Sequence, residues 1–230
     1  MKDLTLLERK IDTKFKNKDL LQEALIHRSY LNEHPEIKLP HNERLEFLGD
    51  AVLELIVTEY LYQKYNQPEG ILTSWRASLV NTESLNKTAE KLNLNDFLYL
   101  SKGEQPITGK ARKVILANAL EAIIGAIYLD QGLEIVKKFI KRTLLVKLPK
   151  IIKYQKYKDP KSTFQEFSQA KFKITPLYKI LEESGPAHDK TFVVGLFLND
   201  KLISRGRGTS KQEAETKAAQ VALKKYKIKP

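Results

Sequence analysis

The sequence predicts an all-α helical bundle followed by a small α+β domain of α-β-β-β-α order. Apolar residues recur with the helical period from residue 4 to about residue 147, and beyond residue 160 the pattern changes to short β-rich runs. A lysine-rich stretch that ends in Asp159-Pro160 separates the two patterns. With 230 residues, 42% of them hydrophobic, the chain is long enough for two domains that each bury a core.

Helical segments make up the first domain, which we place at residues 1–150. Pro, Gly, Asn and Asp punctuate these segments, which are "LLERKI", "KDLLQEALIHRSYL", "NERLEFLGDAVLELIVTEYLYQKY", "ILTSWRASLVNTESLNKTAEKL", "ARKVILANALEAIIGAIYLD" and "LEIVKKFIKRTLLVKL". Residues 151–160 contain several Lys and Tyr residues and end in a turn signal, so they are predicted to be a linker.

The second domain is predicted at residues 161–230 and opens with a helix over "FQEFSQAKF". Ser162 or Thr163 is predicted to cap this helix, because Glu166 follows Thr163 by three residues as in a capping box. Strands are predicted for "LYKILEESG", "TFVVGLFLN" and "KLISRGRGT". A final helix over "SKQEAETKAAQVALKKY" is predicted to begin at Thr209 or Ser210.

The charge of the chain favours an anionic partner. Lys and Arg number 40 against 28 Asp and Glu, which gives a net charge of +12. Such a balance favours nucleic acid or a membrane surface, and the alternative is a basic surface that binds nothing. The chain has no Cys, which excludes disulfides and thiolate metal sites and fits a reducing cytoplasm. No signal peptide follows Met1, and the apolar run at residues 122–129 is too short to span a bilayer, so we expect a soluble cytoplasmic protein.

Three acids lie in the apolar stretch "NERLEFLGDAVL", residues 42–53. One helix over Glu43–Leu61 would place Glu43, Glu46 and Asp50 on successive turns of one face. Gly49 removes a side chain beside Asp50. The apolar stripe of the same helix is predicted to consist of Leu45, Leu48, Val52, Leu55 and Ile56. A carboxylate row so close to a core requires a compensating charge or ligand.

A second pair of polar residues, Asn118 and Glu121, lies in the apolar segment "ANALEAIIGAIYLD" at one-turn spacing. Two facing helices that each present such a pair can direct oxygen ligands toward one hard cation, and oxygen ligands suit Mg²⁺. The absence of Cys and the presence of only 4 His argue against Zn²⁺. The alternative is an ion pair in the core between Glu46 and one of Arg44, Arg76 or Arg112.

These segments resemble a known family. "HNERLEFLGDAVL" is similar to the signature segment of the ribonuclease III family, whose members cut double-stranded RNA, and "ALIHRSY" and "ILANALEAIIGAIYLD" resemble its flanking blocks in order and spacing. The tail segments "DPKSTFQEFSQ", "GPAHDKTFVV" and "GRGTSKQEAETKAAQVAL" resemble the double-stranded RNA-binding domain that follows in bacterial members. The resemblance covers nearly the whole chain.

The resemblance implies that Glu46 and Glu121 bind metal and that Asp50 and Glu121 are the catalytic acids. Asn118 stands where many members have Asp; its amide oxygen can still ligate a metal, with one negative charge fewer. We therefore expect Glu46, Asn118 and Glu121 to bind Mg²⁺, or Mn²⁺ in its place, with weakened affinity. Asp50 is expected to orient or deprotonate water, and Glu43 to touch substrate or the dimer mate.

The resemblance also implies a homodimer that hydrolyses double-stranded RNA to 5′-phosphate and 3′-hydroxyl ends with short 3′ overhangs. A two-fold axis explains the stagger, because it places one site over each strand of an antiparallel duplex. Phe47 matches a family residue that packs across the dimer interface, and its alternative is an ordinary core Phe. No membrane and no small-molecule cofactor are expected. Precursor rRNA and some mRNA and tRNA precursors are the implied substrates.

Other residues of the helical domain allow two interpretations. Trp75 and Arg76 resemble the family's helix that lines the RNA cleft, although a core position is the simpler expectation for Trp75. His27 is expected to be a hydrogen-bonded structural residue rather than a general base. Helix-surface spacing predicts packing, without base stacking, for three tyrosines: Tyr60, Tyr62 and Tyr65.

The tail is expected to bind A-form RNA through the wide minor groove. Side chains that can bond 2′-hydroxyls lie on its first helix, at Thr163, Gln165, Glu166 and Gln169. His188, in the "GPAH" loop, is expected to enter the next minor groove, while Ser210 and Lys211 meet the phosphates between them. Gln212 and Glu215 stand where a more basic helix would carry Lys, so we expect modest, strongly salt-dependent affinity.

Two alternative functions remain open at this point. One is a double-stranded RNA-binding protein whose nuclease site is weakened or inactivated by Asn118 and whose helical domain serves dimerisation or RNA presentation. The other is a structural, ribosome-associated RNA-binding protein without catalysis. Cleavage of duplex RNA distinguishes the endoribonuclease from both.

Overall fold

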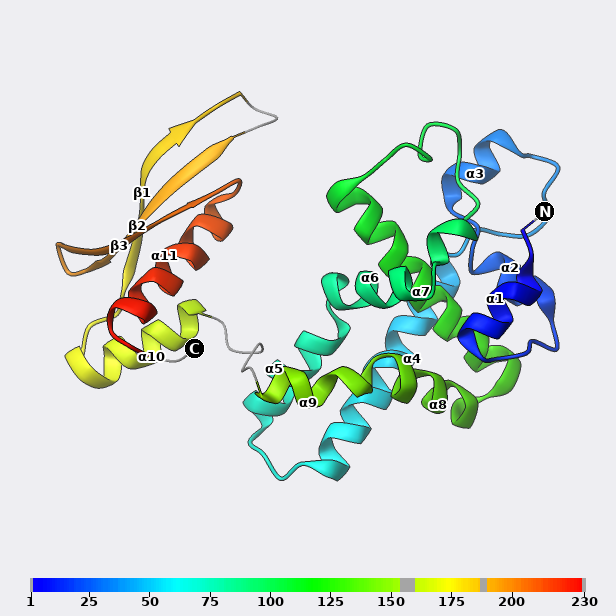
Figure 1. Ribbon diagram of the computed structural model, residues 1–230, viewed down its shortest axis with the longest axis horizontal. Coiled ribbons are helices and arrows are strands. Elements are labelled where there is room, and N and C mark those ends of the chain that lie inside the picture. Colours follow the sequence, from blue (N-terminus) through cyan, green and yellow to red (C-terminus); the bar gives the residue numbers. More distant parts are fainter. Residues whose placement is uncertain (1, 154–159, 187–189, 229–230) are drawn as a thin grey trace. The chain divides into compact units, whose positions relative to one another are not determined.

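A computed structural model of the chain describes residues 2–153, 160–186 and 190–228 (Figure 1). Contacts divide the chain into two compact units, residues 1–154 and residues 155–230. The described part of the first unit is helical, and that of the second has the order α-β-β-β-α, so both predicted fold classes are confirmed. Residues 151–153, predicted as the start of a linker, instead form the end of a helix, and residues 154–159 lie outside the described residues.

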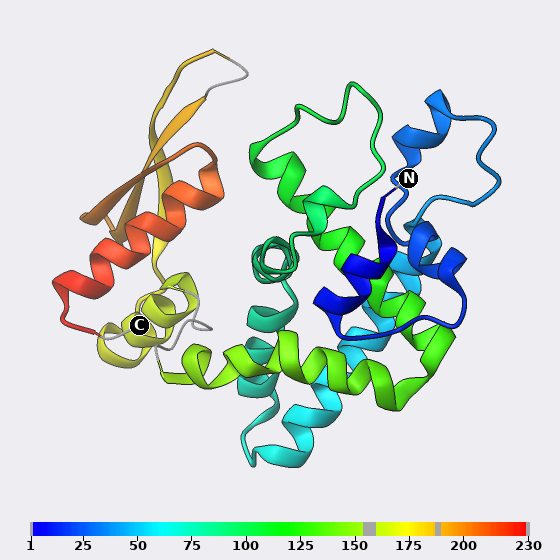
Figure 2. The same ribbon diagram turned by 45° about the vertical axis from the view of Figure 1, so that its right-hand side comes forward.

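The helical unit is built around two long helices that pack against each other, α4 and α7. Figures 1 and 2 show α7 running through the middle of this unit, where it also contacts α6 and α8. The elements are α1 (Leu4–Ile11), α2 (Lys18–Glu23), α3 (Arg28–Glu33), α4 (Glu43–Lys64), α5 (Glu69–Val80), α6 (Thr82–Lys91), η1 (Leu94–Asp96), α7 (Gly109–Gln131), α8 (Leu133–Thr143), η2 (Leu145–Lys147) and α9 (Leu148–Lys153).

Two segments predicted as continuous helices are each broken into two. Residues 24–27 separate α2 from α3, because Ile26 forms a β-bridge with Tyr99, which lies far along the chain. The side chain of His27 then caps α3. Asn81 separates α5 from α6, where its side-chain oxygen accepts from the backbone N–H of Ser84 at 2.9 Å. A long-range pairing and a capping side chain thus override the helical period.

Helices α4 and α7 approach each other so closely that their backbones touch. A Cβ atom added at Gly49 of α4 would lie 1.8 Å from the carbonyl oxygen of Glu121 in α7. A Cβ atom added at Gly125 of α7 would lie 2.3 Å from the carbonyl oxygen of Leu45 in α4. Only glycine fits at either position, and the acidic residues beside them are therefore held face to face.

Helix α7 is, within the part of the chain that the structure describes, long and apolar enough to cross a bilayer by length and composition alone. It extends well beyond the apolar run at residues 122–129. However, 56% of its most apolar stretch is buried inside the unit, and residues such as Leu120 and Ile123 are fully buried. This burial is what the central helix of a globular unit requires.

The α+β unit packs two helices on one face of an antiparallel sheet of order β1-β2-β3 (Figures 1 and 2). Its elements are α10 (Pro160–Phe172), β1 (Leu177–Ser184), β2 (Thr191–Leu198), β3 (Lys201–Gly208) and α11 (Lys211–Lys225). Phe164 of α10, Leu196 of β2 and Leu223 of α11 meet in the core. The helices thus cover one face of the sheet and leave the other without a helix.

The predicted caps of these two helices were half right. Helix α10 already includes Pro160, so Ser162 and Thr163 lie inside it and the predicted capping box with Glu166 is wrong. Proline suits the first turn of a helix, because its missing N–H would have no partner there. Ser210 does cap α11, with its hydroxyl accepting from the N–H of Glu213 at 3.2 Å.

Gly49→Ala is expected to destabilise the helical unit by about 3 kcal/mol, because the new methyl group overlaps the α7 backbone. Chemical denaturation of the full-length protein measures this change. Gly70→Ala is the matched control, since nothing lies within 4 Å of a Cβ at this exposed position in α5. There alanine should add about 0.5 kcal/mol of stability through helix propensity. Equal stability of the two variants would refute the close helix contact.

Candidate active site and RNA-binding surfaces

The predicted acidic cluster assembles where α4 faces α7. Glu46 and Asp50 lie one turn apart on α4, and Asn118 and Glu121 lie one turn apart on α7. Glu121 interacts electrostatically with both Asp50 and Glu46, while the Asn118 side chain hydrogen-bonds Glu46. The structure therefore brings together all four residues that the sequence pattern singled out. Asp50 is exposed, and the other three are half-buried.

The cluster holds more negative charge than its surroundings favour. Burial, followed by repulsion from Asp50 and Glu46, raises the pKa of Glu121 to about 8. Burial also raises the pKa of Glu46, although the hydrogen bond with Asn118 opposes this shift. At neutral pH the Glu121 carboxyl group therefore keeps its proton unless a positive charge arrives.

Arginine does not supply that charge. Arg76 donates to the Thr58 hydroxyl at 2.9 Å and pairs with Glu54 at 3.3 Å. Arg112 donates to backbone carbonyls, including that of Ile107 at 2.9 Å. Among the residues that the structure describes, no ion pair joins a Lys or Arg to Glu46, Asp50 or Glu121. The alternative of an ion pair in the core is therefore not supported.

The oxygen-only donor set fits a hard divalent cation. It consists of three carboxylates and one amide, without nitrogen or sulfur ligands. In the described ranges, no three Asp, Glu or His side chains converge closely enough to hold an ion by themselves. Mutual repulsion opposes such convergence, and Mg²⁺ commonly completes its shell with water. A bound cation would offset the burial and the repulsion from Asp50 and Glu46 that raise the pKa of Glu121.

Glu43 lies outside this cluster. Its side chain is 48% exposed and pairs with Arg28 at 3.5 Å and with His41 at 3.7 Å. Its charge still raises the pKa of Glu46, but the surface pairs direct its oxygens elsewhere. Of the three acids in the opening motif, two face α7 and the third belongs to the surface.

An exposed stripe runs along α4, and of its members the sequence analysis placed only Phe47 at a surface. Its large members are Phe47, Leu55 and Tyr62, which are 81%, 59% and 79% exposed. The core alternative for Phe47 is wrong, and so are the core position predicted for Leu55 and the packing predicted for Tyr62. With exposed Ala51 and Thr58 these residues recur every three to four positions, so helical spacing could have revealed a second face.

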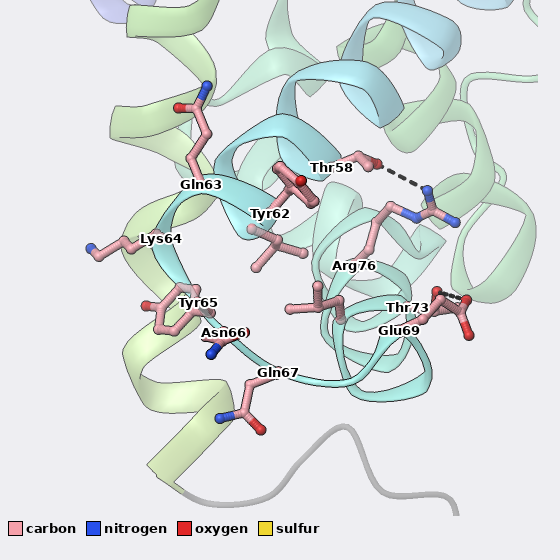
Figure 3. A pocket seen from close by; sticks show the side chains of 12 residues that line it. Thr58, Tyr62, Gln63, Lys64, Tyr65, Asn66, Gln67, Glu69, Thr73 and Arg76 are labelled. Atoms are coloured by element: carbon pink, nitrogen blue, oxygen red, sulfur yellow. Dashed lines mark hydrogen bonds between the residues drawn. The ribbon is translucent and has the colours of Figure 1, made fainter.

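A cavity lies near each end of this α4 stripe. The cavity beside Phe47 measures about 650 Å³, and its walls include Leu20, His41, Leu48 and Leu129. The cavity beside Tyr62 measures about 900 Å³ and lies between the end of α4 and the start of α5. Figure 3 shows Thr58 and Tyr62 on its α4 side and Arg76 across from Thr58, with the Glu69–Thr73 hydrogen bond at its rim.

His27 and Trp75 have the structural roles that were expected. Nδ1 of His27 accepts from the Ser29 N–H at 3.3 Å and lies 2.8 Å from the Ser29 hydroxyl. Burial lowers the pKa of His27, so the neutral ring that this cap requires is retained at neutral pH. Trp75 is 5% exposed and packs edge-to-face with Tyr65 at 5.1 Å between ring centroids.

Six of the seven residues proposed to contact RNA lie on, or at the start of, two helices of the α+β unit. Gln165, Glu166 and Gln169 are exposed on α10, and Thr163 is half-buried beside them. Ser210 and Lys211 stand at the N-terminus of α11, as predicted. His188 lies outside the described residues.

An ion pair changes what the acid on α11 does. Glu215 stands where a more basic helix would carry Lys, and its carboxylate accepts from Lys161 Nζ at 2.5 Å. Lys161, on the first turn of α10, also lies 5.0 Å from the ring centroid of Tyr178. Glu215 therefore holds the Lys161 ammonium group between the two helices, and its negative charge is paired rather than directed at a phosphate.

Comparisons with known proteins agree with this arrangement. A family model described as Ribonuclease-III-like matches residues 17–148, and one described as a double-stranded RNA binding motif matches residues 160–226. Ribonuclease 3 of a Nitratiruptor species is 45% identical over 231 residues, which cover 100% of this chain and 99% of that protein. Ribonuclease 3 of Carboxydothermus hydrogenoformans is 48% identical over 226 residues, 98% of this chain and 96% of that protein.

A solved structure is similar to the helical unit. The nuclease domain of ribonuclease III from Campylobacter jejuni is 44% identical, and the match covers 64% of this chain and 99% of that chain with a TM-score of 0.56. That domain is described as having a region involved in dimer formation.

Glu121→Gln is expected to stabilise the metal-free protein at high pH. The folded pKa of Glu121 is about 8, and its ordinary value is 4.5. Folding therefore loses stability as the pH rises between these values, and the variant, which cannot ionise, escapes the loss. Melting curves in a chelator should coincide near pH 4.5 and differ by on the order of 2 kcal/mol above pH 8.

Glu83→Gln is the control, because the pKa of Glu83 is shifted in the opposite direction to that of Glu121. Hydrogen bonds from Lys87 and Lys113 lower the pKa of Glu83 to about 2, so this substitution should bring no gain at high pH. A Glu121→Gln variant that matches the parent protein at every pH would show that the cluster is not electrostatically strained.

Proposed function

The chain belongs to the ribonuclease III family of endonucleases that cut double-stranded RNA, and on that premise we propose that it hydrolyses RNA duplexes with Mg²⁺ bound between α4 and α7. One observation carries the metal proposal. Burial and two neighbouring carboxylates hold the pKa of Glu121 near 8, and no described cation compensates the cluster. A divalent cation is the partner that would relieve this repulsion.

In this proposal Glu46, Asn118 and Glu121 hold the cation. When bound, the cation supplies positive charge to the phosphate oxygens and lowers the pKa of an attacking water. Mn²⁺ can replace Mg²⁺, since both accept oxygen ligands. The neutral amide of Asn118 contributes one negative charge fewer than an aspartate, so the affinity for the cation is lower.

The exposed Asp50 carboxylate orients the attacking water and accepts its proton. The water oxygen forms the new bond to phosphorus as the bond from phosphorus to the 3′-oxygen breaks. The 3′-oxygen takes up a proton from solvent water, so one product carries a 3′-hydroxyl and the other a 5′-phosphate.

We further propose a homodimer formed along the α4 stripe of Phe47, Leu55 and Tyr62. Leu55 lies midway between Phe47 and Tyr62, which are about 22 Å apart along the helix. When two copies of α4 pair antiparallel about Leu55, Phe47 of each copy lies beside the C-terminal end of the partner's α4. That end carries Tyr62 and the 900 Å³ cavity. The two-fold axis then sets one acidic cluster over each RNA strand, and the staggered cuts leave short 3′ overhangs.

The α+β unit holds the duplex through Thr163, Gln165, Glu166, Gln169, His188, Ser210 and Lys211. Its contacts are to 2′-hydroxyls and phosphates, so affinity depends on shape and salt rather than on sequence. Precursor rRNA and some mRNA and tRNA precursors in the cytoplasm are the proposed substrates.

The test of the function is cleavage of a duplex longer than the roughly 16 base pairs that one such RNA-binding domain spans. The parent protein with Mg²⁺ should cut it, and Asp50→Asn and Glu121→Gln should each lower the rate by at least about 100-fold. Both variants should keep duplex binding in a chelator. Asp19→Asn, a change in the first turn of α2, is the matched control and should cut normally.

A metal titration in the same assay tests the ligand assignment. Asn118→Asp should lower the Mg²⁺ concentration at half-maximal rate by roughly 10-fold, because it restores a carboxylate ligand. An unchanged requirement would refute the role of Asn118. Duplex binding without cutting at any Mg²⁺ or Mn²⁺ concentration would instead establish the RNA-binding protein with an inactive nuclease site.

Phe47→Ser is expected to weaken the dimer about 30-fold, the effect of losing about 2 kcal/mol from one buried aromatic anchor. Sedimentation velocity across a concentration series measures it. Val146→Ala is the control, since Val146 is 66% exposed in η2 and lies off the α4 stripe. A dimer constant that Phe47→Ser leaves unchanged would remove α4 from the interface.

A further inference from the structure

The face of the sheet turned away from α10 and α11 carries an ordered set of side chains. Along β2, Val194 and Leu196 are buried toward the helices, so the residues between and beside them point to the other face. The register of the sheet extends this alternation across all three strands. We call the residues that point away from the helices the outer sheet face.

Cross-strand neighbours divide the outer sheet face into rows. One row is apolar and contains an aromatic ring, the next is basic around a central glycine, and the third is mixed. They are Leu177–Phe197–Leu202, Lys179–Gly195–Arg205 and Glu182–Val193–Arg207. Three of the four charged residues are basic, so the face is positive on balance.

The apolar row forms a platform over the glycine. A Cβ atom added at Gly195 would lie 2.7 Å from the ring of Phe197 and 2.9 Å from the Leu202 side chain. Leu181, at a bulge of β1, would lie 3.0 Å away. These side chains therefore lean together over Gly195, and Leu177 beside them is 52% exposed.

The cations of the outer sheet face remain accessible. Lys179 Nζ lies 5.3 Å from the ring centroid of Phe197. Arg205 and Arg207 are exposed, and within the described parts of the chain no ion pair joins either to an acid. Their alternation with Gly206 and Gly208, which pack against α11, directs both guanidinium groups to the same side.

We propose that the outer sheet face binds single-stranded RNA, such as an unpaired loop or tail beside a duplex. Unpaired bases stack on aromatic rings and guanidinium planes, and basic side chains next to the ring meet the phosphates. A duplex does not fit, because its bases are already stacked and a flat sheet cannot enter its grooves. Among the described residues, those proposed to contact duplexes lie on α10 and at the start of α11, so one unit would hold both forms of RNA at once.

The positive balance and the aromatic ring favour RNA over an acidic protein segment. An acidic protein segment would contact the apolar row and pair with the basic side chains, but it would not require an aromatic ring. A strand of RNA uses the aromatic ring for stacking and the guanidinium groups for stacking or phosphate contact. The proposal concerns a surface separate from the acidic cluster, and its failure would leave the cleavage of duplexes untouched.

The experiment measures binding of the full-length protein to a fluorescent, unstructured RNA of about 12 nucleotides by anisotropy in a chelator. Phe197→Ala should weaken binding about 10-fold through lost stacking. Arg205→Gln with Arg207→Gln should lower the slope of log affinity against log salt by about 1.4, for two lost phosphate contacts. The arginine variant changes exposed side chains only, so it tests the surface even where Phe197→Ala impairs folding.

Lys211→Glu is the control, since this lysine belongs to the surface proposed for duplexes. It should weaken duplex binding and leave the single strand bound, and the arginine variant should do the reverse. No binding by the parent protein, or loss of single-strand binding in Lys211→Glu alone, would overturn the proposal. So would an acidic, leucine-containing peptide that binds in place of RNA and is lost in the arginine variant.

Discussion

The backbone contact between α4 and α7 is the constraint on which the helical unit depends. At Gly49 and Gly125 no side chain separates the two helices, so the acids beside them cannot move apart without breaking the core. A wider crossing would let the carboxylates relax into solvent and would abolish the raised pKa of Glu121. Close packing of the two helices therefore maintains the repulsion among the carboxylates, which a cation would relieve. The same crossing leaves Phe47 on the exposed side of α4.

Local sequence patterns were sufficient to predict the fold class and the acidic cluster. The positions of Glu46 and Asp50, and of Asn118 and Glu121, follow from helical spacing alone, which needs no tertiary information. Three β-rich runs with turn residues between them similarly predicted the sheet. The single apolar stripe predicted for α4 was only partly right, since Val52 and Ile56 are buried whereas Leu55 is exposed. The choice between core and surface depends on which helix packs against α4, and spacing alone does not contain that information.

Long-range contacts account for the rest. The break before α3 depends on the pairing of Ile26 with Tyr99, and no local pattern announces a bridge between residues so far apart. The pairing of Glu215 with Lys161 likewise joins two helices across the α+β unit. The sequence alone indicated only that Glu215 stands where a more basic helix would carry Lys. Its partner, Lys161, lies far away in the sequence and comes close only because α10 packs against α11 in the folded unit.

Salt is expected to act on the α+β unit in two ways, because the Lys161–Glu215 pair connects the two helices that carry the residues proposed to contact duplex RNA. Added ions screen the phosphates and also loosen this pair, whose side chains are partly exposed at 34% and 28%. The two helices would then be held together less firmly, and the duplex contacts proposed for them would weaken. A count of phosphate contacts taken from salt titration would therefore exceed the number of cations that touch RNA.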